Sequence, residues 1–554
     1  MNALMPQAHT LESLSSLDIG IVVVYMAVIF ILAQSVSRAK PAEAMTTGRY
    51  FFASHQLPFW AVGTSIIAAN ISAEQIIGMS GSGYRIGLAV ASYEWMAALT
   101  LILVGKYILP VFFHTGVMTM PGFLQLRFGS GVKNLMAVFW LCQYVLINLT
   151  GILWLGGTAV STITGIDTVT ALVGLGVFAL LYQIRGGLRA SAQTDVVQVA
   201  ILIAGGLVIL AMTLCTISGD WSLDGALQGF GHLMSRHPDH FRMILPKESP
   251  YYQDLPGIAV LIGGMWILNL SYFGFNQYIV QRALAAKSLT EAQKGIAFSA
   301  YLKLLMPLIV VLPGMTAILL APGLARGDMA YPTMMSLLPP GLLGLVFAAL
   351  IAAIVASSAS KINSIATIVT LDLVQPAFPA LTDRQLMIVG RTTAVGALLI
   401  AVMVAKPLLG DFDQVFQFGQ NLTGFFAPGI VVIFLLGLFW RGCSPAGALA
   451  GIISGVTMSA FFFTANHLHQ HPQWCGMDWQ FLTQHVPFMP FLNRVGWVFW
   501  ITLAVCVGVS KLLPDKQLFP GWQLTAGTFR TSRLFNLMAL GVILILIALY
   551  AVFW

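Results

Sequence analysis

The sequence predicts an all-α protein that crosses a membrane many times. Of its 554 residues, 58% are hydrophobic and only 8% are charged, against roughly a quarter charged in soluble domains. The apolar residues fall in blocks of about 20, the length of helix that crosses a hydrocarbon core of about 30 Å. These blocks are too long for barrel strands and do not alternate, which leaves helices as the structure that satisfies the backbone in lipid.

About fourteen spans are expected. They begin near residues 18, 58, 88, 135, 168 and 192, then near 257, 296, 338 and 386, and finally near 413, 445, 492 and 533. The first block follows no basic region and precedes no small-residue cleavage site, so it is interpreted as a retained span rather than a signal peptide. One membrane domain follows, with an external loop at 217–256 that is long enough to hold a short surface helix.

Basic residues gather in alternate connections between the spans. Arg127 and Lys133 follow the third span, and Arg282, Lys287 and Lys294 follow the seventh. This asymmetry marks the cytoplasmic side, which places both termini outside. The basic residues form no continuous surface, so nucleic-acid binding is not expected. No GxxxxGK[ST] phosphate loop occurs, which argues against ATP as the energy source.

Two spans carry matching polar interruptions. Residues 68–75 in the second span and 269–277 in the seventh place polar and small side chains at mid-membrane depth. Lipid tolerates unwound backbone mainly where it lines a site. The spacing of five spans predicts two inverted repeats, each opening with a broken helix; the alternative is that both stretches are polar patches on tightly packed helices. Repeats of this kind are typical of secondary active transporters.

The predicted layout has five parts. A flanking helix and cytoplasmic loop occupy 1–57, the first repeat 58–216, the external loop 217–256, the second repeat 257–440, and three flanking helices 441–554. His467, His469 and His471 are expected in an external loop. Histidine is a common metal ligand, so these three could hold a metal ion; the alternative is ordinary solvation, which is the commoner state of histidines in polar loops.

Several ionisable residues lie at membrane depth, where a charge is costly and therefore indicates a functional site. The candidates are Glu74, Glu94, Lys106, Asp195, Lys303, Lys361 and Asp372. Lys106, Asp372 and Glu74 can be explained as helix-end or structural charges. Glu94, Asp195, Lys303 and Lys361 have enough apolar sequence around them to require an internal partner.

Long segments of the chain resemble the solute:sodium symporter family. They are IIAANISAEQIIGMSGSGY (66–84), ASYEWM (91–96), GGLRASAQTDVVQV (186–199), LPGIAVLIGGMW (255–266), GFNQYIVQRALAAKSLTEAQKGI (274–296) and AAIVASSASKINSIATIVTLD (352–372). The resemblance implies a fold of two inverted five-helix repeats with flanking helices, and sodium-driven uptake of a neutral hexose of the galactose or glucose type. It also implies a bacterial inner-membrane location.

The resemblance further implies a sugar site. Its residues are Gln75, Met79, Tyr93, Glu94, Asn269, Tyr272, Lys303, Phe416 and Gln420. Amide, carboxylate and ammonium groups supply directional hydrogen bonds to sugar hydroxyls, and aromatic rings cover the sugar faces. Tyr272 resembles the inner gate that stacks on the sugar; the alternative is an ordinary buried tyrosine.

A sodium site is implied by the same resemblance. Its ligands are the carbonyls of Ala68, Ile71 and Ala353 and the hydroxyl of Ser357, and Asp195 lies on the exit path. Ala356 stands where the family has a second serine ligand. Ala353, Ser357 and Lys361 share one helical face at a spacing of four residues, so Lys361 either approaches the cation path, pairs with Asp195, or is a structural vestibule charge.

The remaining functional alternatives are proton-coupled or uncoupled transport of a sugar or polyol, and a sugar sensor built on the same fold. An enzyme is disfavoured because no nucleophile and base, and no cluster of metal ligands, accompany the site, so no catalytic residue is assigned. The expected partners are the sugar, Na⁺ and the lipid bilayer, without an obligatory protein partner.

Overall fold

The computed structural model describes residues 14–37, 57–116, 119–470, 473–474, 477–515 and 524–554. Within these ranges, the side chains of 32–37, 184–196, 470, 473–474, 477–478 and 480 are not described. The described chain is almost entirely helical. Its only strands, β1 (Gln473–Trp474) and β2 (Met477–Asp478), form one short antiparallel hairpin.

The fold agrees with the predicted all-α membrane class. Among the described residues, nine helices are long and apolar enough to cross a membrane, or ten if one bent pair is a single span. They are Leu88–Thr115, Ser130–Thr164, Val197–Ser218, Leu289–Leu320, Leu342–Ala377, Asp383–Leu409, Pro445–His469, Phe491–Leu512 and Arg533–Val552, and the bent pair is Val415–Thr423 with Ala427–Phe439. Shorter apolar helices lie at Ser16–Ile31, Phe59–Asn70 and Thr168–Gln183.

The helices of the first half are, in order, α1 (Ser16–Ser37), α3 (Phe59–Asn70), η2 (Glu74–Gly78), α4 (Met79–Arg85), η3 (Leu88–Ala91), α5 (Ser92–Leu103), η4 (Val104–Ile108), α6 (Leu109–Thr115), α7 (Met120–Phe128), α8 (Ser130–Cys142), η5 (Gln143–Leu149), α9 (Thr150–Thr164), α10 (Thr168–Ser218), α11 (Leu223–Arg236) and η6 (Pro238–Phe241). Local signals set several of these ends. The Asp167 carboxylate caps α10 by accepting from the Thr170 amide at 3.1 Å, and Gly165 ends α9 with a φ of 76°.

The second half continues with α12 (Ala259–Ile262), α13 (Gly264–Asn269), η7 (Leu270–Gly274), α14 (Gln277–Leu284), α15 (Leu289–Ile309), α16 (Val311–Leu320), η8 (Gly327–Met329), α17 (Ala330–Met335), α18 (Leu342–Thr367), η9 (Ile368–Val374), α19 (Gln375–Ala377), α20 (Asp383–Leu409), α21 (Val415–Thr423), α22 (Ala427–Phe439), α23 (Pro445–Gln470), α24 (Gln480–His485), α25 (Phe491–Leu512), η10 (Ala526–Phe529) and α26 (Arg533–Val552).

Both predicted interruptions are breaks in helices. After α3, Ile71 is extended with φ −67° and ψ 106°, and η2 begins three residues later. After η7, Asn276 is extended with φ −89° and ψ 124°, and α14 follows it. At each break, backbone N–H and C=O groups lose their partners within the helix. Lipid cannot replace these partners, so we expect the groups to face a binding site.

Two expectations about boundaries are wrong. The spans expected from 168 and 192 share one helical segment, α10. His467 and His469 do not lie in a loop, because α23 continues to Gln470. The ring of His469 bonds to the Val486 carbonyl at 2.7 Å. His471 lies outside the described residues, and no group of three metal-binding side chains occurs among those that are described.

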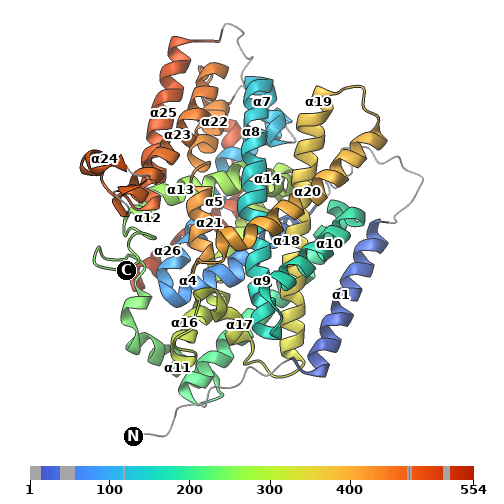
Figure 1. Cartoon of the computed structure of the whole chain (residues 1–554), viewed down its shortest axis with the longest axis vertical. Helices are drawn as coiled ribbons and strands as arrows, with labels where there is room; N and C mark the ends of the chain where they lie inside the picture. Colours follow the sequence, from blue (N-terminus) through green and yellow to red (C-terminus); the bar gives the residue numbers. More distant parts are fainter. Residues whose placement is uncertain (1–13, 38–56, 117–118, 471–472, 475–476, 516–523) are drawn as a thin grey trace.

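The ends of the chain pack on loops of one side. Helices α1, α10 and α18 lie against one another (Figure 1). The Asp18 carboxylate at the start of α1 accepts from the amides of Gly341 and Gly344, both at 2.7 Å. At the other end of the chain, the Phe553 carbonyl accepts from the Met243 amide at 2.7 Å. The external loop holds the expected surface helix, α11.

Candidate transport site

A cavity lies where the first broken helix, η5 and α21 meet. Four of its lining residues, Gln75, Tyr272, Phe416 and Gln420, belong to the predicted sugar site. It is also lined by Glu74, Gln143, Asn148, Gly151, the apolar end of α20 and several other residues of η5 and α21. Polar groups and an aromatic ring on an otherwise apolar wall are typical of small-molecule sites.

Glu94 and Lys303 form an ion pair beyond Tyr272. Their charged atoms are 2.6 Å apart, and the side chains are only 3% and 1% exposed. The Lys303 ammonium also donates to Asn70 Oδ1, and it lies 5.2 Å from the centre of the Phe273 ring. The sequence indicated that Glu94 and Lys303 each need an internal partner. In the structure they are partners of each other.

A chain of hydrogen bonds joins this ion pair to the second broken helix. Asn70 Nδ2 donates to the Tyr272 hydroxyl at 3.1 Å. The Tyr278 hydroxyl also donates to the hydroxyl of Tyr272. Tyr272 therefore stands between the cavity, which it lines, and the ion pair. Its role as a gate stays a prediction.

Five predicted sugar residues, Glu94 and Lys303 among them, lie outside the cavity lining. The Tyr93 hydroxyl donates to Gln417 Oε1 at 2.9 Å, and its ring lies edge-on to Phe416 with centroids 5.0 Å apart. Met79 is fully buried. Asn269 is buried, and its side-chain nitrogen has no protein partner. The predicted sugar site is therefore only partly the lining of this cavity.

Several buried amides, two of which line the cavity, have atoms without a partner among the described residues. They include the acceptors Gln75 Oε1 and Gln143 Oε1 and the donors Asn269 Nδ2 and Gln417 Nε2. Unpartnered buried polar atoms cost free energy unless water or a ligand satisfies them. A ligand that both donates and accepts hydrogen bonds would satisfy this mixture, whereas an anion would satisfy only the donors.

The structure brings together two of the expected cation ligands. The Ser357 hydroxyl on α18 lies 3.3 Å from the Ile71 carbonyl oxygen at the first break. Two oxygens bound to a hard cation at about 2.3–2.6 Å stand about 3.3–3.7 Å apart at right angles, so this pair fits one cation. Ala68 lies one turn before Ile71, and Ala353 one turn before Ser357. The side chain of Asp195 is not among those described.

Lys361 points into a neutral aromatic environment. Its ammonium lies 3.6 Å from the centre of the Tyr278 ring and 5.0 Å from that of Tyr144, and it donates to Asn148 Oδ1 at 3.4 Å. The lysine is 4% exposed, which rules out a solvated vestibule charge. An ion pair with Asp195 stays a prediction.

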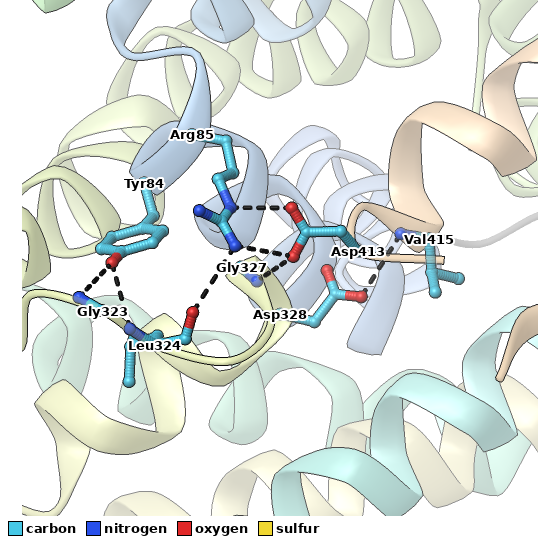
Figure 2. A network of polar contacts seen from close by, with 8 residues as sticks. All are labelled: Tyr84, Arg85, Gly323, Leu324, Gly327, Asp328, Asp413 and Val415. Carbon is cyan, nitrogen blue, oxygen red and sulfur yellow. Dashed lines mark hydrogen bonds and ion pairs between the residues drawn. The ribbon is translucent and has the colours of Figure 1, made fainter. Parts of the chain in front are cut away.

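A second polar network joins α4 to the loops before η8 and α21 (Figure 2). The Arg85 guanidinium pairs with the Asp413 carboxylate at 2.7 Å, and that carboxylate also accepts from the Gly327 amide at 2.7 Å. The Tyr84 hydroxyl accepts from the amides of Gly323 and Leu324 at 3.2 and 3.3 Å. We call the residues drawn in Figure 2 the outer clamp, because the topology predicted from the sequence would place these loops on the outer side.

Asp328 lies beside Asp413 in the outer clamp (Figure 2). It is fully buried, and one carboxylate oxygen accepts from the Val415 amide at 3.3 Å. Its other oxygen faces Gly81, where an added Cβ would stand only 2.7 Å from that oxygen. Burial raises the pKa of Asp328 to about 8, against the opposing effects of the Val415 hydrogen bond and Arg326. Asp328 is therefore largely protonated at neutral pH.

The profile of the sodium:solute symporter family matches residues 50–455. A sodium/glucose cotransporter of Vibrio parahaemolyticus is 45% identical over 563 aligned residues, covering 98% of this chain and 99% of that protein. The chain belongs to the sodium:solute symporter family. A second relative of this symporter, the sodium/myo-inositol cotransporter 2 of Mus musculus, is 30% identical across 84% of this chain and 74% of its own length.

Solved structures of other symporters share the fold. A Na⁺-coupled sialic acid symporter in a substrate-bound, outward-open state covers 91% of this symporter with a TM-score of 0.72 at 19% identity. The nucleobase-cation symporter Mhp1 in a closed conformation covers 85% with a TM-score of 0.50 at 14% identity. The chain is thus a multi-pass membrane transporter rather than an enzyme, as the sequence predicted.

The sequence missed several residues of the symporter's site. Asn70 was noted only as part of a polar stretch, although it connects Lys303 to Tyr272. Tyr144, Asn148 and Tyr278, which surround Lys361, were not singled out. Arg85, Asp328 and Asp413 lie in connections where charged residues are common, so no sequence signal distinguished them.

Proposed function

We propose that this chain couples the inward movement of sodium to the uptake of a neutral hexose of the galactose or glucose type. One observation carries the proposal: the Ile71 carbonyl and the Ser357 hydroxyl lie 3.3 Å apart beside the cavity that Gln75 and Tyr272 line. An ion held there would join α18 to the broken helix that supplies a sugar-binding side chain. The name of the Vibrio relative supports the same pair of substrates.

The donor and acceptor pattern favours a neutral polyol. Gln75 and Gln143 present unpartnered acceptors, Asn269 and Gln417 present unpartnered donors, and Phe416 supplies a ring face. Sugar hydroxyls donate and accept, so they can satisfy both kinds of atom. Lys303 is already paired with Glu94, so its ammonium is not free to neutralise a carboxylate substrate.

Alternating access is the mechanism that this arrangement supports. The outer clamp joins α4 to α21 on one side of the cavity, and Tyr272 with Tyr278 closes another. We infer that sodium holds the first break against α18 and preorganises Gln75, and that hexose binding then lets the predicted repeats rock until Tyr272 moves aside. Sodium then leaves past Asp195, in a bacterial inner membrane with both termini outside.

The energy of one sodium ion suffices for accumulation. Entry of one charge at 100 mV releases about 2.3 kcal/mol, and a tenfold concentration gradient adds about 1.4 kcal/mol. Together they would concentrate a hexose by a few hundredfold.

The direct test is uptake of labelled galactose or glucose by purified protein in liposomes. An imposed inward sodium gradient should drive uptake, and replacing external Na⁺ by K⁺ should abolish it. Gln75→Ala should weaken uptake by about 5- to 150-fold, because it removes a hydrogen-bond partner worth about 1–3 kcal/mol. Equal uptake in K⁺ would reject sodium coupling, and no uptake of either hexose would reject the cargo.

One observation favours proton-coupled or uncoupled transport as a second candidate. Ala356 provides no hydroxyl beside Ser357, and Lys361 already places a positive charge on the same helix. Uptake that persists without sodium and follows a proton gradient would indicate proton-coupled transport. Uptake that persists without sodium and ignores a proton gradient would indicate uncoupled transport.

A further inference from the structure

Lys361 and Glu74 carry opposite charges on the two segments that a sodium ion would join. Lys361 lies four residues after Ser357 on α18, and Glu74 lies three residues after Ile71 at the start of η2. Residues three or four apart on a helix lie on one face, one turn from each other. Lys361 therefore lies one turn after Ser357 on α18, and Glu74 opens the segment that follows the break at Ile71.

Contacts with neighbouring side chains hold Lys361 in place on α18. Tyr278 presents its ring face to the Lys361 ammonium at 3.6 Å, and Asn148 presents an acceptor at 3.4 Å. These contacts are favourable to an ammonium. Glu74 lines the same cavity as Asn148, the residue that Lys361 contacts. Gly151 gives the Glu74 carboxylate its space, since a Cβ there would stand 2.8 Å from Oε1.

We propose that Lys361 determines the strength of the cation site by acting as a built-in cation. Its attraction to Glu74 ties α18 to the second half of the first broken helix, which is the tie that sodium provides in the function proposed above. The same ammonium repels a sodium ion bound by Ile71 and Ser357. The inference rests on that proposed function for the identity of the ion.

Two features of α18 both weaken sodium binding. Ala356 removes one oxygen ligand, and Lys361 adds one positive charge. Like charges a few ångströms apart in a weakly polar interior repel strongly. The wild-type protein should therefore bind sodium weakly, and its broken helix should stay closed against α18 in part without sodium. The contact of Lys361 with Tyr278, whose hydroxyl bonds to Tyr272, links this tie to the gate residue.

Equilibrium binding of ²²Na⁺ to the purified full-length protein, without hexose, tests the proposal. Lys361→Met should bind sodium at least tenfold more tightly than wild type, where each factor of ten corresponds to about 1.4 kcal/mol. Lys361→Arg keeps the charge and should remain close to wild type. Ala356→Ser, which supplies the hydroxyl, should also tighten binding.

The matched control is Lys406→Met on α20, which removes an exposed lysine distant in sequence from α18 and should leave sodium affinity unchanged. Equal sodium affinity in wild type and Lys361→Met would overturn the proposal. If Lys361→Met yields no monodisperse protein, Lys361→Gln, which keeps a donor toward Asn148, takes its place under the same criterion.

Failure of this inference can be told apart from failure of the proposed function. Sodium-driven hexose uptake with identical sodium affinity in wild type and Lys361→Met would overturn the role of Lys361 and leave the function standing. Tighter ²²Na⁺ binding in Lys361→Met without sodium-driven hexose uptake in wild type would support the role of Lys361 and reject the function.

Discussion

At the scale of single residues, the ion pair of Glu94 with Lys303 organises the predicted sugar site. A pair this deeply buried is costly to desolvate, and it persists only when further hydrogen bonds satisfy its charges. Asn70 and the ring of Phe273 supply part of that support. The pair also fixes Asn70, which in turn holds the hydroxyl of Tyr272.

Removal of one partner should therefore destabilise the protein strongly. Lys303→Met strands a buried carboxylate, and we expect a loss of about 3–5 kcal/mol in the free energy of unfolding. The double change with Glu94→Gln should recover part of that loss. Thermal unfolding of the purified variants measures both effects.

The control is the partly exposed pair Lys294 and Glu291, whose charged atoms are 3.2 Å apart with side chains 25% exposed. Lys294→Met should cost less than about 1 kcal/mol. Equal losses for Lys303→Met and Lys294→Met would show that the buried pair has no special structural role.

At the scale of helices and loops, the outer clamp makes the stability of the folded protein depend on pH. The pKa of Asp328 is about 8 in the folded protein, whereas an unperturbed aspartate titrates near 3.9. Between these values the folded state keeps a proton that the unfolded state loses. The contribution of Asp328 to stability is therefore complete below about pH 4 and declines as pH rises toward 8.

We expect wild type to lose thermal stability between pH 5 and 8 relative to Asp328→Asn. The asparagine stays neutral at every pH and keeps an acceptor for the Val415 amide. The measurement is the melting temperature of both proteins across this range. As pH falls from 8 to 5, the melting temperature of wild type should rise relative to that of Asp328→Asn. A constant difference between them would contradict a raised pKa at Asp328.

The same scale shows what the sequence could and could not predict. Apolar block length located most spans, and the polar residues 68–75 and 269–277 located both breaks, because burial and backbone satisfaction act on local sequence. The contacts between breaks and partner helices were not predictable. Glu94 and Lys303 are 209 residues apart, and their pairing depends on how α5 and α15 pack. The sequence predicted a connection between two spans at 184–196, because Gly186 and Gly187 disfavour a helix, whereas α10 continues through this segment.

At the scale of the whole molecule, the central claim is that one conformational cycle moves sodium and hexose together. The two expected sodium ligands lie on α18 and at the first break, while the cavity uses that break, the second broken helix and α21. An ion and a sugar that share a broken helix must each change the affinity of the site for the other, because coupling between two ligands is reciprocal.

Reciprocity gives the most direct measurement. Liposomes that contain the purified protein, with equal sodium on both sides and an inward gradient of galactose or glucose, should take up ²²Na⁺ faster than liposomes without hexose. Empty liposomes given the same hexose gradient provide the control. Hexose entry that leaves ²²Na⁺ uptake at the level without hexose would contradict coupled transport.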